Sequence, residues 1–208
     1  MPTLLSNISK HIQNAYRKAG EFIEDEREFA LSESFLNATF QRFITDNVAM
    51  LKDLHADVHD DWLRLYATLK YQGMDVTLSV DLKLVQMELN KKLQLIVFEQ
   101  VSQTKVLDAQ YPSILHRCGV YSALFFYQKV LDKDPLGLIL EKLNVLKVKD
   151  GLLHIDLNRW LGKNKSIIDT LNKVHVNHGV LREKQLVILG NLNLAALLNL
   201  QSTEQLNS

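Results

Sequence analysis

Two pairs of histidines have spacings that could bring two imidazoles to one metal ion. His55 and His59 are four residues apart, and His175 and His178 are three apart. On a helix these spacings place both rings on one face, and neutral imidazole nitrogens bind zinc. On a strand, residues four apart are separated by about 13 Å, at roughly 3.3 Å per residue. Apolar residues alternate at positions 54, 56 and 58, which favours a strand. Neither pair has a third ligand nearby, so we expect no metal site.

The other reactive side chains fit structural roles better than chemical ones. His116 lies in an apolar segment and fits a core or edge histidine better than a general base. Cys118 is the only cysteine, which excludes an internal disulfide, and it fits a small buried side chain in a reducing compartment. The acidic run 21–28 is typical of a solvated helix face. There is no Gly-rich phosphate loop, G-x-S-x-G turn or zinc-binding cysteine pair. We expect a protein without a cofactor or catalytic activity, although an active site of dispersed residues would leave no motif.

One short stretch resembles a membrane anchor. Trp160 is followed by Lys163 and Lys165, and an aromatic ring beside lysines is typical of a lipid–water interface. Because two lysines are too few to bind a membrane by charge, a packed tryptophan beside a solvated loop is the alternative. The first 20 residues contain no continuous apolar region of a secretory signal, and no run of about 20 apolar residues could span a bilayer. We expect a soluble, cytoplasmic protein.

Composition favours one neutral domain. The 208 residues include 24 lysines and arginines and 24 aspartates and glutamates, so no net field attracts nucleic acid. Three prolines and the lack of a Gly/Ser-rich linker predict a single domain spanning residues 1–208. A domain of this length buries roughly 70% of its extended-chain surface, which is enough for a core.

Residues 54–107 show the alternation of a half-buried antiparallel sheet. Apolar and polar side chains alternate within each run, which is the period of two of a strand with one buried face. The apolar positions are Leu63, Leu65, Ala67, Leu69, Met74, Val76, Leu78, Val80, Leu82 and Leu84. We therefore expect residues 54–107 to form an antiparallel meander with one apolar face.

The polar side chains of this stretch predict its register. If Gln72-Gly73 is a two-residue hairpin loop, every facing polar pair is chemically compatible. The facing pairs are Lys70 with Asp75, Thr68 with Thr77, Tyr66 with Ser79 and Arg64 with Asp81. A second hairpin at Asp60-Asp61 sets Asp57 opposite Arg64, so Arg64 would lie between two aspartates in an exposed charged ladder. Adjacent apolar residues at Leu84-Val85 break the alternation and predict a bulge.

Helices and further hairpins flank the predicted meander. Residues 6–47 and residues 112–143 show helical spacing of apolar side chains. Residues 145–192 predict two hairpins separated by a helix at Ser166–Leu171, and the first hairpin turns at Asp150-Gly151.

Within the expected helix 114–131, the stretch from Cys118 to Leu131 is apolar nearly all round. A helix without a polar face must be covered on every side, and the apolar face of the long sheet is the obvious cover. We therefore expect an α+β fold in which a long, curved, mostly antiparallel sheet wraps around a buried helix.

A weak internal repeat links these segments. Three times a short helix precedes a valine, two polar residues, a turn residue and two apolar residues. The three units end in Val58-His59-Asp60-Asp61-Trp62-Leu63, Val148-Lys149-Asp150-Gly151-Leu152-Leu153 and Val176-Asn177-His178-Gly179-Val180-Leu181. In this order of helices and hairpins the chain resembles the LmeA-like phospholipid-binding family of the tubular lipid-binding (TULIP) superfamily. The resemblance implies a curved sheet around a helix, with an apolar cavity for acyl chains, but no residue-specific signature.

Two functions remain open from the sequence. The first is binding of a lipid, fatty acid or isoprenoid between the sheet and the helix, because ligand pockets are mostly apolar. The residues expected to line this cavity are Met74, Val76, Leu78, Val80, Leu82, Leu124, Phe125 and Phe126. The second is a fully packed interaction or assembly module that uses the N-terminal helices Ile8–Ile44 as its contact surface.

Overall fold

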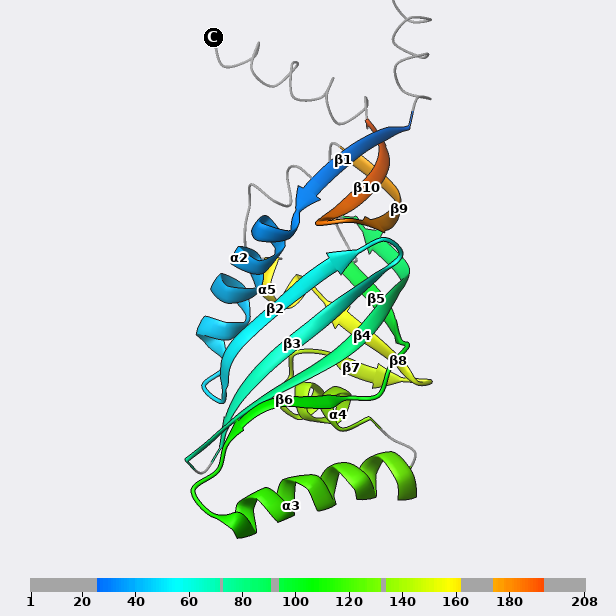
Figure 1. The fold of residues 1–208 in the computed structure, drawn as a ribbon. Helices are drawn as coiled ribbons and strands as arrows, with labels where there is room; N and C mark the ends of the chain where they lie inside the picture. Colours follow the sequence, from blue (N-terminus) through cyan, green and yellow to red (C-terminus); the bar gives the residue numbers. More distant parts are fainter. Residues whose placement is uncertain (1–25, 72, 91–93, 132–133, 162–173, 193–208) are drawn as a thin grey trace, which may run out of the picture.

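Two antiparallel sheets form the body of the protein (Figure 1). The computed structural model describes residues 26–71, 73–90, 94–131, 134–161 and 174–192. The strands of the larger sheet are β2 (Leu51–His59), β3 (Trp62–Tyr71), β4 (Met74–Leu89), β5 (Gln94–Gln100), β6 (Lys105–Gln110), β7 (Lys147–Lys149) and β8 (Leu152–Asp156). Their order is β2-β3-β4-β5-β8-β7, and β6 also pairs with β4. The smaller sheet has the order β1-β10-β9, formed by β1 (Arg27–Ser32), β10 (Gln185–Leu192) and β9 (Val174–Arg182).

Helices flank these sheets, which confirms the expected α+β class with a large antiparallel sheet. The helical segments are α2 (Glu33–Phe43), the 3₁₀ turn η1 (Thr45–Asn47), α3 (Ile114–Phe125), the π-helical turn η2 (Phe126–Val130), α4 (Pro135–Lys142) and α5 (Asn158–Leu161). Side chains cap the starts of two of them: Ser32 accepts from the backbone N–H of Phe35, and Asp134 accepts from those of Leu136 and Gly137.

The predicted register of the first three strands is confirmed. Lys70 lies opposite Asp75 and Arg64 opposite Asp81 between β3 and β4, while Asp57 lies opposite Arg64 between β2 and β3. The register between β4 and β5 shifts after Leu84, so the bulge also lies where the alternation breaks. Side-chain alternation and tight loops therefore determine the pairing of neighbouring strands.

The partners of the polar side chains differ from the predicted ladder. Arg64 donates to both carboxylate oxygens of Asp81, at 2.6 and 3.1 Å. Asp57 instead accepts from the hydroxyl of Tyr66 at 2.8 Å, and Asp75 pairs with Lys52 at 2.7 Å. Register alone therefore does not determine which polar side chains pair, because each can reach several neighbours.

Side chains from two helices cap the outer strands of the larger sheet. At β2, Asn37 of α2 donates to the carbonyl of Ala56 at 2.9 Å and accepts from its N–H at 2.8 Å. At β7, Glu141 of α4 accepts from the N–H of Val148 at 3.0 Å. These bonds occupy backbone groups that an open sheet edge would offer to another strand.

The smaller sheet packs across the end of β4. A Cβ atom at Gly179 of β9 would lie 2.8 Å from both Sδ and Cε of Met87 and 3.1 Å from Leu84 Cδ2. A side chain at this position would require the flexible end of Met87 to shift, so glycine suits the close approach. The core continues from the larger sheet into α4, β9 and β10 through Leu136, Leu140, Leu181 and Leu186.

The N-terminal segment folds differently from the sequence prediction. Within residues 6–47, where helices are expected, Arg27–Ser32 forms strand β1 and pairs with β10, and helix α2 begins only at Glu33. The part of this predicted helical region before residue 26 lies outside the described residues. Strand pairing with a partner more than 150 positions away has no local signature, so the expectation of helix is wrong at β1.

The third unit of the proposed repeat is not a hairpin. Strand β9 runs without a turn through Val176–Leu181, and the chain reverses instead between Arg182 and Gln185. Gly179 suggested a turn, but its lack of a side chain serves the contact with Met87. The predicted helix at 166–171 lies outside the described residues. The expected repetition therefore does not hold at its third unit.

Helix α3 is not the buried centre of the sheet. None of its residues is buried. Figure 1 shows α3 at the end of the protein opposite the three-stranded sheet, beyond β6 and α4. The expectation of a buried helix is therefore wrong, because apolar composition indicates that a helix needs cover but not which surface provides it.

Candidate binding surface

The sheet residues expected to line a cavity lie mainly in the closed core. Leu78, Val80 and Leu82 are only 3%, 2% and 2% exposed and belong to the hydrophobic cluster that joins β4 to α4, β9 and β10. Val76 is partly buried against the same cluster, and Met74 is half-buried at the start of β4. The protein's own side chains therefore cover the apolar face of β4 along Leu78–Leu82.

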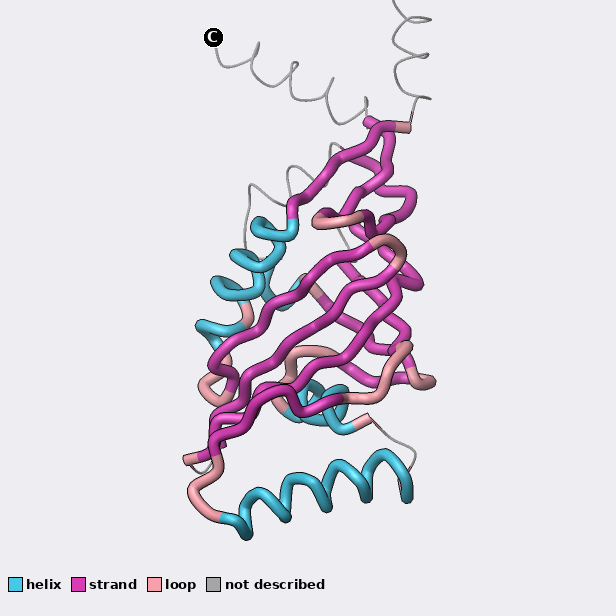
Figure 2. Tube along the Cα trace, in the orientation of Figure 1, coloured by secondary structure: helices cyan, strands magenta, loops and turns pink. Residues whose placement is uncertain are grey.

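The helical residues of the expected cavity face a different environment. Leu124 is half-buried, whereas Phe125 is 64% and Phe126 is 49% exposed. In Figure 2 the helical segment that contains them lies at the periphery, past the last strands of the larger sheet. The structure thus places the two groups of predicted residues in the core and at the surface, and does not bring them together.

The segment of α3 and η2, residues 114–130, turns one narrow seam toward the protein. His116, Val120, Leu124 and Gln128 are half-buried and recur every four residues, so they lie on one side of the helix. The remaining helix surface is largely exposed. We call this segment the apolar helix.

Polar bonds hold the C-terminal end of the apolar helix against the body. Gln128 donates to the carbonyl of Thr104 at 2.8 Å. The hydroxyl of Thr104 donates to the carboxylate of Asp134, with oxygen–oxygen distances of 2.6 and 2.7 Å. Asp134 also caps α4, so its carboxylate connects the loop after β5 to the start of α4. The bond from Gln128 therefore connects the C-terminal end of the apolar helix to the body, while most of the helix surface is exposed.

Exposed apolar side chains concentrate on this segment. Of the 14 large hydrophobic residues exposed in the described part of the chain, eight lie between residues 114 and 131. They are Ile114, Leu115, Tyr121, Phe125, Phe126, Tyr127, Val130 and Leu131. The rings of Phe126 and Tyr127 meet edge to face, with centroids 6.2 Å apart. An exposed apolar area of this kind marks a binding surface more often than a solvated one.

The charged side chains of the apolar helix all have the same sign. Arg117 and Lys129 lie near its two ends, and residues 109–131 contain no aspartate or glutamate. The chain as a whole is neutral, so this segment carries a local positive charge. The apolar helix therefore combines apolar side chains with cations.

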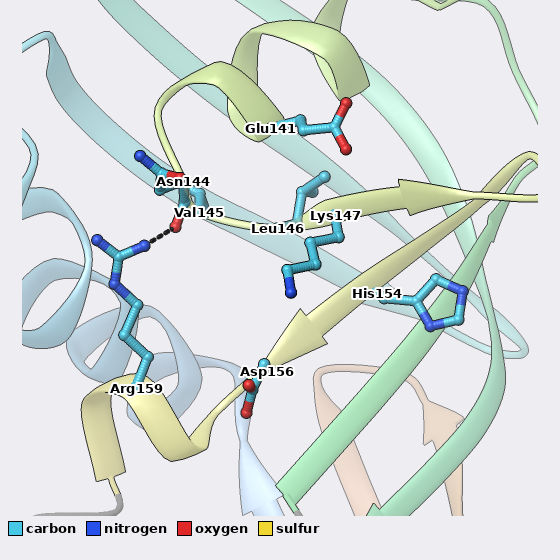
Figure 3. A pocket seen from close by; sticks show the side chains of 8 residues that line it. All are labelled: Glu141, Asn144, Val145, Leu146, Lys147, His154, Asp156 and Arg159. Atoms are coloured by element: carbon cyan, nitrogen blue, oxygen red, sulfur yellow. Dashed lines mark hydrogen bonds between the residues drawn. The ribbon is translucent and has the colours of Figure 1, made fainter.

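A second candidate is a polar cleft between α4, the β7–β8 hairpin and α5 (Figure 3). Its volume is about 470 Å³, and its lining residues are Glu141, Asn144, Val145, Leu146, Lys147, His154, Asp156 and Arg159. Arg159 donates to the carbonyl of Asn144, and Asp156 accepts from the N–H of Asn158. Cations and carboxylates are mixed around the cleft, so no single ligand charge is favoured. The sequence offered no signal for this cleft, because the contacts join side chains from three elements.

The described histidines and the cysteine have other contacts than those of a metal site. His55 contacts Asp53 and stacks on Tyr66 with ring centroids 4.6 Å apart. His116 bonds the hydroxyl of Ser113 at 2.7 Å. In the part of the chain that the structure describes, no group of three or more metal-ligating side chains could hold an ion. Cys118 is exposed on α3, so the expectation that it is buried is wrong.

Two predicted contact regions lie largely beyond the described residues. Lys163 and Lys165 belong to the segment 162–173, and the backbone of Trp160 lies in α5. The alternative contact surface Ile8–Ile44 is described only from residue 26 onward. Its helix α2 is bound to the edge of β2 through Asn37.

Comparison with protein-family models, curated proteins and solved structures finds no match to this chain. Among the described residues, no helix has both the length and the apolar character needed to cross a membrane.

The sequence contained part of the signal for the apolar helix. Its lack of a polar face was visible, as was the absence of acidic residues around Arg117 and Lys129. The exposure of the helix was not visible in the sequence, because the sheet offered enough apolar surface to cover it. Ile114 and Leu115, which are 76% and 79% exposed, were not among the predicted site residues for this reason.

Proposed function

We propose that the protein binds lipid without catalysing a reaction and that the apolar helix makes the contact. The supporting observation is that residues 114–131 expose eight large apolar side chains while no residue of α3 or η2 is buried. Covering apolar area is worth about 25 cal/mol per Å², so an acyl chain against this surface would be stabilised.

This proposal moves the ligand from the interior of the sheet to the exposed helix. Phe125 and Phe126 remain contact residues, whereas Leu124 lies on the half-buried seam and Leu78, Val80 and Leu82 support the fold from the core. We further propose that the protein has no catalytic activity, is cytoplasmic and is related to the LmeA-like family. The resemblance supports it through the class of ligand alone.

Lipid binding is tested on the purified full-length chain. Native mass spectrometry and organic extraction should detect bound lipid, and added oleate or phospholipid should raise the melting temperature. A ligand at 100 times its Kd stabilises by about 2.7 kcal/mol, which corresponds to roughly 5–10 °C for a domain of this size. Absence of both bound lipid and a melting shift would contradict the proposal.

Paired variants localise the binding site. Phe125→Ser together with Phe126→Ser should remove most of the lipid-induced shift, because both rings are exposed on the apolar helix. Phe35→Ser is the matched control, since Phe35 is 56% exposed on α2. An equal loss in the control and the paired variant would contradict the assignment to the apolar helix.

A further inference from the structure

We propose that the apolar helix lies flat in the headgroup region of an anionic bilayer, with its axis parallel to the membrane plane. This inference rests on the proposed lipid-binding function and specifies the form in which the lipid is bound. A negatively charged membrane surface, rather than a single lipid molecule or a protein groove, is the partner.

Two cations are too few to bind a membrane by charge alone, but here they accompany an exposed apolar surface, and their sign favours an anionic partner. Arg117 and Lys129 are the only lysine and arginine residues of the segment, and they are separated by twelve positions. At 1.5 Å per residue, about 18 Å of helix separates them, so each reaches a different headgroup. Their aliphatic stems can lie along the apolar surface while their charged ends reach the phosphates. Each cation near an anionic surface increases affinity roughly fivefold.

The position of the apolar side chains favours a helix that lies on the membrane. The half-buried seam at His116, Val120, Leu124 and Gln128 holds one side of the helix to the protein, and the opposite side is free for contact along its whole length. The segment of 17 residues is about 25 Å long, and it ends in aromatic side chains that favour the lipid–water interface. The bond from Gln128 to Thr104 holds the C-terminal end of the helix to the body in this orientation.

The same observations disfavour a second copy of the chain as the occupant. Pairing two apolar helices would bring together Arg117 and Lys129 from both copies without any carboxylate from either segment. Interfacial helices that bind anionic membranes combine a buried apolar surface with lysine or arginine. The apolar helix combines an exposed apolar surface with one arginine and one lysine, although it has no continuous polar face.

The chain's own cysteine allows a direct experiment. Cys118 is the only cysteine and is exposed on α3, so a polarity-sensitive fluorophore can be attached there without any substitution. The labelled full-length protein is mixed with vesicles of phosphatidylcholine alone, or of phosphatidylcholine with phosphatidylglycerol, at low and high salt. Unlabelled protein is sedimented with the same vesicles to measure affinity independently of the label.

We expect the fluorophore emission to shift to the blue with the anionic vesicles and less so at high salt. Arg117→Gln with Lys129→Gln should weaken sedimentation with anionic vesicles roughly 25-fold, from about fivefold for each cation. Lys83→Gln with Lys149→Gln removes two exposed cations from β4 and β7 and should leave the affinity unchanged.

Three results would overturn the inference. The first is equal affinity for neutral and anionic vesicles, and the second is an unchanged emission spectrum in all vesicles. If dispersed oleate still raises the melting temperature, the second result removes the membrane inference alone; if no form of lipid binds, the proposed function fails as well. The third is a blue shift in lipid-free protein that grows with protein concentration, which would assign the surface to a second copy.

Discussion

Asp81 lies in the polar face of the larger sheet and accepts both hydrogen bonds from the guanidinium of Arg64. These bonds hold the pKa of the Asp81 carboxyl below its usual range. Because the folded-state pKa is lowered, the carboxylate contributes stability above the unfolded-state value of about 3.9, and this contribution is lost as the pH falls through the folded-state pKa.

Replacing Asp81 should therefore have a pH-dependent effect. Asp81→Asn is expected to lower the free energy of unfolding by about 0.5–1 kcal/mol near pH 7, since the pair is partly solvated. The difference between this variant and the wild type should shrink below about pH 4. Urea unfolding across this pH range measures it. A difference that persists unchanged at pH 2.5–3 would show that the ion pair is not its cause.

Gln94 presents the opposite situation, a polar side chain without a partner. It is fully buried at the start of β5, and neither Nε2 nor Oε1 has a hydrogen-bond partner among the described residues. An unpaired buried amide costs about 1–3 kcal/mol. This cost had no sequence signature, since it depends on the segments that enclose the side chain.

The substitution Gln94→Met should consequently stabilise the protein. It removes both unpaired polar atoms at similar volume, so we expect the free energy of unfolding to rise by about 1–2 kcal/mol. Gln100→Met is the control, because Gln100 donates to the carbonyl of Ser102 at 2.6 Å and its loss should destabilise. Chemical denaturation of both variants checks this. Destabilisation by Gln94→Met would mean that the amide has a partner in solution.

At the scale of elements, α2 is held against β2 by a side chain as well as by packing. Asn37 satisfies both backbone groups of Ala56, and the substitution Asn37→Ala would leave them without this partner. We expect a loss of about 1–3 kcal/mol in stability. Amide hydrogen exchange at Ala56 should accelerate, while exchange at Thr68 in the interior strand β3 changes less.

Thr39→Ala is the matched control for this prediction. The hydroxyl of Thr39 is on the same helix but bonds only to the carbonyl of Phe35, at 2.8 Å, among the bonds the structure shows for it. Its removal should leave exchange at Ala56 unchanged. Equal acceleration in both variants would indicate that α2 simply unfolds and that Asn37 has no particular role at the sheet edge.

Elements joined by tight turns could be predicted, and elements joined over long distances could not. The hairpins at Asp60-Asp61 and Asp150-Gly151 follow from local residue types and alternation. The pairing of β1 with β10 and the return of β6 to β4 depend on contacts between distant segments. In β9, a glycine that packs closely against Met87 resembled a turn residue.

At the scale of the molecule, one part of the apolar surface is buried in the core and another part is exposed. The face of the large sheet is closed by α4, β9 and β10 into one core. The apolar helix is left at the surface with one half-buried seam. The sequence therefore predicted how much apolar surface the chain carries, whereas its division between core and surface depended on the tertiary fold.

Hydrogen exchange of the full-length chain, with and without phospholipid vesicles, tests this account most directly. A helix with few buried contacts opens readily, and lipid contact should suppress that opening. We predict slower exchange confined to residues 114–130, with exchange in β3 and β4 unchanged. Unchanged exchange in residues 114–130, or protection that appears instead around Leu78–Leu82 on β4, would contradict the assignment of lipid binding to the apolar helix.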